Sequence, residues 1–137
     1  DRTIEQRAGA DIPLIFELEG EAGFRRRERA VLEELTQARD RVLATGGGVV
    51  LDPDNRAALM SRGFVVYLQA PLAQLYERTR RDRNRPLLQT EDPKARIQAI
   101  LEEREPLYRA VADLIVKTDN RTVRSVVKDL IKRLPRP

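Results

Sequence analysis

The sequence contains no cysteine, histidine or tryptophan, and only 4% of its residues are aromatic. The absence of cysteine excludes a disulfide framework and a thiolate metal site. The absence of histidine removes the commonest general base and the commonest zinc ligand. Any acid–base chemistry must therefore use carboxylates, lysine or tyrosine, or the reaction must proceed mainly through the placement of charge.

Long apolar runs are also missing. No run approaches the roughly 20 residues that a membrane span needs, and no signal peptide is visible. The first residue is Asp1 rather than methionine, so the natural start can lie further upstream. We therefore expect a cytoplasmic protein that makes no contact with a membrane.

Basic residues outnumber acidic ones, 26 to 22, which gives a net charge of +4. Such a balance fits an ordinary soluble domain, a nucleic-acid-binding protein or a protein that binds small anions. The scarcity of aromatic residues argues against a stacking platform for single-stranded nucleic acid. The arginines concentrate at 25–29 and 78–85, which suits an anion pocket at least as well as a duplex footprint, so we expect no nucleic-acid partner.

Hydrophobic periodicity divides the chain into alternating helices and strands. We expect strands at 42–45, 64–68 and 114–117, and helices at 2–8, 12–18, 21–39, 52–63, 71–81, 92–103, around Pro106 and at 123–134. This alternation predicts an α/β fold, with a parallel sheet and helices on both of its faces. Ligands of such sheets bind beyond the carboxyl ends of the strands.

Three glycines, Gly46 to Gly48, follow the first expected strand. Glycine lets backbone N–H groups approach a ligand oxygen closely. Three glycines also simply make a tight turn, and this motif alone does not separate the two interpretations.

Phe24-Arg25-x-x-Glu28 places Arg25 and Glu28 on one face of a helix, where they can pair. The plain interpretation is a solvated charged face. The functional one is that Glu28 holds Arg25 for a ligand carboxylate, since arginine binds carboxylates through a rigid fork.

Two further motifs carry arginine. The run from Arg78 to Leu88 enters a loop that contains Arg85 and Pro86. A mobile loop can bring a cation to a transferring phosphate and exclude water, although a charged helix end is an equally simple reading. Arg104-Glu-Pro-Leu-Tyr108 joins two expected helices, and read alone it is a packing joint.

Taken together, these motifs resemble the shikimate kinase family. The motifs occur in that family's order and approximate spacing. They are Asp1 beside an acid-rich helix, Phe-Arg-x-x-Glu at 24–28, a strand and glycine turn at 43–48, Arg-x6-Arg-Pro-Leu-Leu at 78–88 and Arg-x-Pro-Leu-Tyr at 104–108. The resemblance covers essentially the whole chain. It implies a P-loop kinase fold of the nucleoside-monophosphate-kinase type and transfer of the ATP γ-phosphate to the 3-hydroxyl of shikimate, in the chorismate pathway of aromatic amino-acid biosynthesis.

The resemblance also implies roles for individual residues. Asp1 would bind the ring hydroxyls and orient, or accept the proton of, the attacking hydroxyl. Arg25 and Arg104 would clamp the substrate carboxylate. The remaining expected residues are Phe24 and Glu28 as the wall and support of that clamp, Gly47 and Gly48 as backbone donors, Arg85 as the lid arginine, and Arg78 with Arg121 and the loop 120–123 at the nucleotide. The family often has proline where this chain has Val123.

One departure from the family is large. The P-loop pattern G-x-x-x-x-G-K-[ST] does not occur in the sequence. By resemblance, the chain starts after the first two strands, so we expect ATP and Mg²⁺ to depend on ligands outside it and assign no metal ligand within it. The resemblance also places the segments 42–45 and 64–68 on either side of the missing P-loop strand.

We therefore expect one domain, 1–137, that is incomplete at its N-terminus and works as a monomer. Its parts would be substrate-binding helices at 1–39, a core at 40–81, a lid loop at about 82–91 and C-terminal helices and strand at 92–137. Two alternatives stay open: another small-molecule P-loop kinase, of the gluconate type, and a non-catalytic basic module that binds RNA or a protein.

Overall fold

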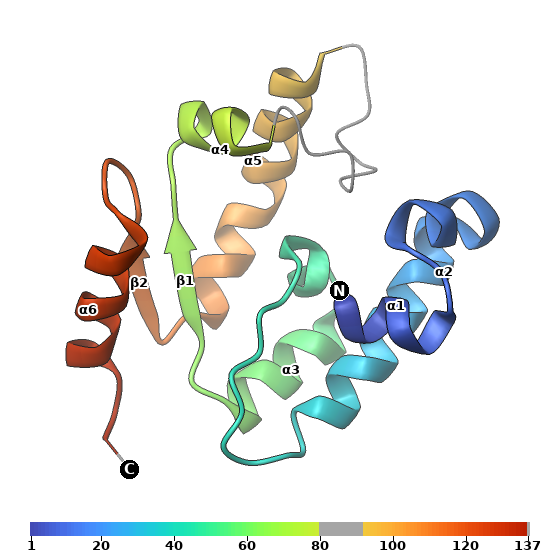
Figure 1. The fold of residues 1–137 in the computed structure, drawn as a ribbon, viewed down its shortest axis with the longest axis horizontal. Coiled ribbons are helices and arrows are strands. Elements are labelled where there is room, and N and C mark those ends of the chain that lie inside the picture. Colours follow the sequence, from blue (N-terminus) through green and yellow to red (C-terminus); the bar gives the residue numbers. More distant parts are fainter. Residues whose placement is uncertain (80–91, 137) are drawn as a thin grey trace.

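The computed structural model describes residues 1–79 and 92–136 (Figure 1). In chain order its elements are α1 (Arg2–Ala8), α2 (Ile12–Leu35), the 3₁₀ helix η1 (Gly47–Leu51), α3 (Pro53–Arg62), β1 (Val66–Gln69), α4 (Leu72–Thr79), α5 (Pro93–Val111), β2 (Leu114–Lys117) and α6 (Val123–Arg133). The expected lid loop at about 82–91 lies outside the described residues.

Aspartate followed by proline starts two of the helices, as the sequence predicts. The Asp52 carboxylate accepts a hydrogen bond from the backbone N–H of Asp54 at the start of α3. The Asp92 carboxylate accepts one from the N–H of Ala95 at the start of α5. Each carboxylate satisfies a backbone donor that the first helical turn leaves unpaired.

The helix α2 combines two segments that the sequence separates at 12–18 and 21–39. At Gly20 the backbone leaves the helical region, with φ 72° and ψ 179°. Glycine adopts such a positive φ without a steric penalty, so the two segments join there at a kink. The second segment ends at Leu35 rather than at Arg39.

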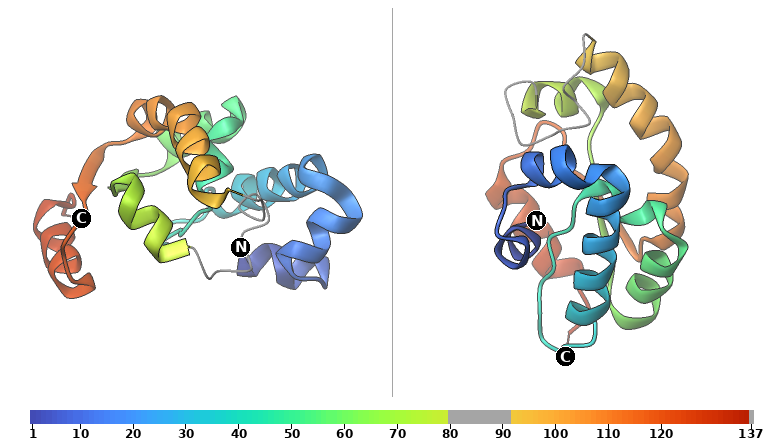
Figure 2. Two further views of the ribbon diagram at one scale, coloured as in Figure 1. Left: turned by 90° about the horizontal axis from the view of Figure 1, so that it is seen from above. Right: turned by 90° about the vertical axis from the view of Figure 1, so that its right-hand side faces the viewer.

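The sheet of the described residues has two parallel strands, β1 and β2, in register from Val66 beside Leu114 to Gln69 beside Lys117. β2 lies where the sequence predicts it, whereas β1 begins two residues later than the expected 64–68. The helices α5 and α6 lie on opposite sides of this pair (Figure 2). The predicted α/β class, with a parallel sheet and helices on both faces, is confirmed.

The expected strand at 42–45 is wrong. Residues 41–46 have no regular secondary structure, and Val42 is 99% exposed. A strand exists through its hydrogen-bonded partner, and β1 pairs with β2 rather than with this segment. An apolar groove of about 560 Å³ separates the two, lined by residues of both that include Leu43, Ala44, Val66 and Leu68. The groove lies where the resemblance leaves a gap between them.

The expected break near Pro106 is also wrong, because α5 runs without interruption from Pro93 to Val111. Proline removes one backbone donor and usually kinks a helix. Here Pro106 is exposed, whereas Ile97, Arg104 and Val111 are buried. The helix continues through Pro106, and this places Arg104 inside a helix rather than in a joint.

Two apolar clusters hold the helices together. One, of Ile4, Ile12, Ile15, Phe24 and Val31, joins α1 to α2. The other, of Leu32, Val49, Val50 and Val111, joins α2, η1 and α5. Because both clusters include residues of α2, they fix this helix between the chain's N-terminus and the glycine turn.

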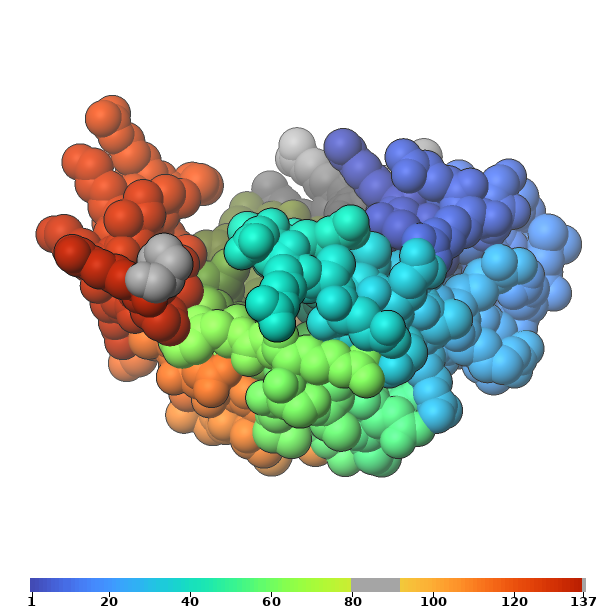
Figure 3. Space-filling model, turned by 90° about the horizontal axis from the view of Figure 1, so that it is seen from below, coloured from blue at the N-terminus to red at the C-terminus, as the bar shows by residue number. Residues whose placement is uncertain are grey.

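The helix α6 stands at one end of the molecule, far from α1 and α2 at the other (Figure 3). The residues of the predicted apolar stripe lie in a helix, as expected. Part of this stripe is exposed, because Val123 is 81% and Ile131 70% exposed. None of the helices within the described ranges is long and apolar enough to cross a membrane.

Candidate active site

The glycine turn at 46–48 leads from the extended segment into η1 and is held by side chains from two other helices. From α3, Asn55 Nδ2 donates to the Val49 carbonyl at 3.1 Å and Arg56 Nη1 to the Val50 carbonyl at 2.7 Å. From α5, the Tyr108 hydroxyl donates to the Gly47 carbonyl at 2.9 Å. Polar contacts from α3 and α5 therefore help to fix the turn and the start of η1 in place.

Arg25 reaches this turn from α2. Its Nη1 donates to Glu28 Oε1 at 2.9 Å, and its Nη2 lies 3.5 Å from the Glu21 carboxylate. The predicted Arg25–Glu28 pair is thus present, and Glu28 is only 6% exposed. Phe24 is buried beside them, with the Arg25 guanidinium carbon 5.1 Å from the centre of its ring.

Asp1 and Glu28 lie beside Gly46, and the absence of a side chain at Gly48 lets Arg25 approach the turn closely. A β-carbon on Gly46 would lie 3.6 Å from Asp1 Oδ1 and 3.6 Å from Glu28 Oε2. One on Gly48 would lie within 2.5 Å of the Arg25 guanidinium, closer than any real contact. The turn therefore needs glycine at 48 for proximity, because its φ is not in the left-handed region.

Arg104 reaches the same turn from α5. It is 8% exposed, and its Nη1 would lie 3.6 Å from a β-carbon on Gly47. Among the described residues, the Nε atoms of Arg25 and Arg104 are both buried without a hydrogen-bond partner. A half-buried and a buried guanidinium group, each with an unpaired Nε donor among the described residues, can bind an anion at one turn. A carboxylate matches their planar fork.

Tyr108 is the residue of this site that sequence reasoning missed. Tyr108 belongs to the Arg-x-Pro-Leu-Tyr motif, but the motif alone does not indicate its role. Its position four residues after Arg104 was the available signal, since residues at that spacing share a helix face. Burial raises the pKa of the Tyr108 hydroxyl, while the charge and hydrogen bond of Arg104 act in the opposite direction.

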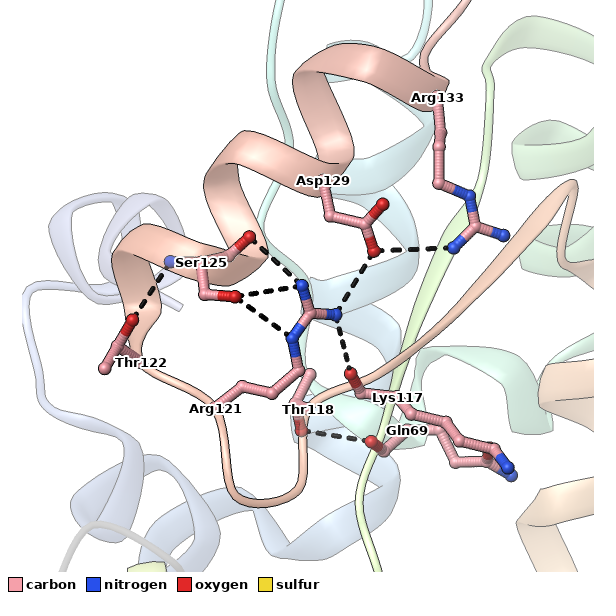
Figure 4. Close-up of polar contacts among 8 residues, drawn as sticks. All are labelled: Gln69, Lys117, Thr118, Arg121, Thr122, Ser125, Asp129 and Arg133. Atoms are coloured by element: carbon pink, nitrogen blue, oxygen red, sulfur yellow. Dashed lines mark hydrogen bonds and ion pairs between the residues drawn. The ribbon is translucent and has the colours of Figure 1, made fainter.

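Arg78 and Arg121 both make hydrogen bonds at the loop that follows the carboxyl end of β2. Arg78 donates from Nη1 to Thr118 Oγ1 and from Nη2 to the Thr118 carbonyl, both at 3.3 Å. Arg121 donates to the Lys117 carbonyl at 3.3 Å, to Ser125 and to Asp129 (Figure 4). Both arginines therefore make hydrogen bonds at this loop, and Arg121 also ties the loop to α6.

Arg85, the expected lid arginine, lies outside the described residues. Within those residues there is also no cluster of three or more acidic side chains that could hold a metal ion.

Comparison with known proteins identifies the family. The family model described as Shikimate kinase matches residues 1–135. The chain belongs to the shikimate kinase family. It is 53% identical over 134 residues to a shikimate kinase of Hahella chejuensis and 56% identical to one of Legionella pneumophila strain Corby, in each case over 98% of this chain. These matches span 70% and 77% of the two relatives.

Solved structures that resemble this chain are also shikimate kinases. A shikimate kinase from Acinetobacter baumannii in complex with shikimate has a TM-score of 0.94 and 47% identity, over 96% of this chain and 74% of its own. A shikimate kinase from Aquifex aeolicus has a TM-score of 0.80 and 34% identity, over 96% and 76%. The predicted family and its P-loop kinase fold are confirmed, and the gluconate-type kinase and the basic binding module are set aside.

Proposed function

We propose that Asp1, Arg25, Glu28, the glycine turn and Arg104 form the shikimate site of an ATP-dependent kinase that phosphorylates the 3-hydroxyl of shikimate. The observation that carries this proposal is a pair of arginines, half-buried Arg25 from α2 and buried Arg104 from α5. They reach one glycine turn, and their buried Nε donors are unpaired among the described residues. Shikimate has one carboxylate, and the pair supplies a matching site for it.

In this proposal Arg25 and Arg104 bind the substrate carboxylate from two sides. Glu28 accepts from Nη1 of Arg25 at 2.9 Å, while Nε of Arg25 has no hydrogen-bond partner among the described residues. A guanidinium that is already held loses less conformational entropy when it binds. Phe24 forms a rigid wall, because its ring also packs 4.9 Å from the ring of Phe16. The backbone of Gly47 and Gly48 completes this side of the site.

Asp1 serves the reacting end of the substrate. Its carboxylate faces the turn beside Glu28, where it can accept hydrogen bonds from the ring hydroxyls. It orients the 3-hydroxyl and accepts its proton as the new oxygen–phosphorus bond forms and the bond to the β-phosphate oxygen breaks, releasing ADP.

The nucleotide would bind beside the loop after β2, where Arg78 and Arg121 both make hydrogen bonds. The carboxyl end of a parallel strand is the usual place for such a ligand. Arg85 would act from the lid on the transferring phosphate. We expect the protein to work as a monomer.

A coupled assay of ADP release tests this function in the natural gene product that contains these residues. With ATP and Mg²⁺, shikimate should support turnover and gluconate should not, because two arginines and an aspartate match a hydroxylated ring carboxylate. Turnover with gluconate alone, or RNA binding that weakens with salt while shikimate has no effect, would contradict the proposal.

A further inference from the structure

The Tyr108 side chain connects the glycine turn to the helix that carries Arg104. Its hydroxyl donates to the Gly47 carbonyl at 2.9 Å, and Arg104 lies one helical turn earlier on α5. A β-carbon on Gly47 would lie 2.6 Å from the Tyr108 hydroxyl oxygen and 3.6 Å from Arg104 Nη1. The hydroxyl and the guanidinium therefore lie next to each other at the same glycine.

The Tyr108 ring is itself held in place by β1. It packs against the ring of Tyr67, with centroids 5.0 Å apart. The Tyr67 hydroxyl donates to Glu105, which also accepts from Gln69 Nε2 at 3.1 Å and from Arg109 Nε at 2.8 Å. A ring fixed on one side by the strand can hold the turn at a constant distance from α5.

From these contacts we propose that Tyr108 is a positioning residue, which sets the glycine turn relative to Arg104 so that one carboxylate can contact both. This inference rests on the proposed function, because it concerns the same shikimate site. Tyr108 acts through Gly47 and Arg104 rather than on the reacting atoms.

The protonation state of Tyr108 suits this role. Burial raises the pKa of the Tyr108 hydroxyl above the ordinary tyrosine value. At neutral pH the hydroxyl is therefore protonated and can donate a hydrogen bond to the Gly47 carbonyl. Arg104 acts against this rise, which is a further sign that the guanidinium lies close to the hydroxyl.

The first test removes single hydroxyl groups from the two stacked rings in the natural gene product. Tyr108→Phe keeps the ring and loses the bond to the turn, so the KM for shikimate should rise about three- to tenfold, the range for one neutral hydrogen bond. The KM for ATP and kcat should stay within about twofold, because the nucleotide contacts lie at another loop. The comparison variant Tyr67→Phe keeps the stacked ring and loses only the hydrogen bond to Glu105, so the KM for shikimate should rise less than in Tyr108→Phe.

The second test is a double-mutant cycle between Gly47 and Tyr108. Gly47→Ala should raise the KM for shikimate, because the new methyl group meets the Tyr108 hydroxyl oxygen at 2.6 Å. In the Tyr108→Phe background that oxygen is gone, and the nearest remaining atoms, Arg104 Nη1 and Tyr108 Cζ, would be at 3.6 and 3.7 Å. Gly47→Ala should then cause no further rise in the KM for shikimate, because both substitutions act through the same contact.

The results separate this inference from the function on which it rests. A wild-type protein without shikimate phosphorylation would defeat the proposed function. An active wild-type protein whose KM for shikimate is unchanged by Tyr108→Phe would defeat the positioning role alone. So would an equal rise in the KM for ATP, or strictly additive effects of the two substitutions.

Discussion

A β-carbon on Gly48 would lie 2.3 Å from Nη2 of Arg25, so the guanidinium occupies space that only glycine leaves open. We expect Gly48→Ala to push the Arg25 fork away from the turn and to lower shikimate affinity by about tenfold or more, as for a lost charge-assisted hydrogen bond. The melting temperature should change little, because the end of a long side chain can move. Calorimetric titration with shikimate measures the loss.

Gly63→Ala is the matched control for this substitution. Its β-carbon would lie 3.5 Å from the Leu59 carbonyl, an ordinary contact away from the site. Shikimate affinity should be unchanged in this variant. If Gly48→Ala binds shikimate as tightly as Gly63→Ala does, Arg25 does not act from the position that the structure gives it.

The buried Glu28 carboxylate should contribute to stability as well as to binding. Glu28→Gln keeps the shape of the side chain but removes the charge that pairs with Arg25 at 2.9 Å. Because the pair is largely buried, we expect the free energy of unfolding to fall by about 1–3 kcal/mol. Shikimate affinity should fall as well, since the guanidinium is held less firmly.

The exposed pair of Glu19 and Arg27, also within α2, provides the comparison. Glu19→Gln should have little effect, because exposed ion pairs are screened by solvent. Urea unfolding followed by circular dichroism compares the two variants. Equal effects would mean that Glu28 is an ordinary surface carboxylate.

The ion pairs of Asp129 predict how stability depends on pH. The hydrogen bond from Arg121 holds the pKa of Asp129 below its ordinary value, and Arg133 adds to this against the opposing effect of burial. In the unfolded chain the pKa is about 3.9. The contribution to stability is therefore complete well above that pH and is lost as the pH falls toward the lower pKa of the folded state.

Asp129→Asn should accordingly lower the melting temperature at pH 7, and its difference from wild type should shrink as the pH falls below about 4. Asp40→Asn, at an exposed turn residue with φ 58°, serves as the control, because asparagine tolerates the same backbone conformation. A difference that stays constant between pH 7 and pH 3 would show that the Arg121–Asp129 pair does not stabilise the loop after β2.

Local signals predicted the helix starts and β2 well, but not the features that depend on distant partners. The caps at Asp52 and Asp92 work through neighbouring N–H groups, so a short stretch of sequence contains the whole interaction. The apolar run 42–45 has the composition of a strand, yet a strand also needs a partner along its length. Proline at 106 indicates a helix end locally, because the packing of the buried face of α5 depends on residues that are distant in the sequence.

The same difference applies to the site. Arg25 and Glu28 are three residues apart, so their pairing could be predicted from helical spacing. Their meeting with Arg104 depends on α2 and α5 packing on one glycine turn, and in the sequence analysis only the family resemblance suggested it. The contact between Tyr108 and Gly47 joins residues 61 positions apart, and nothing in either local segment indicates it.

The central claim is that Arg25 and Arg104 recognise the carboxylate of shikimate. The most direct measurement compares, by titration calorimetry, the affinities of the natural gene product for shikimate and for its primary amide, which has nearly the same shape but no charge. We predict that the wild-type protein and an Arg27→Lys control bind the amide about 10- to 100-fold more weakly. In Arg25→Lys, which loses the fork, this difference should shrink because shikimate itself binds more weakly. Equal affinities for shikimate and its amide in the wild-type protein would contradict the account.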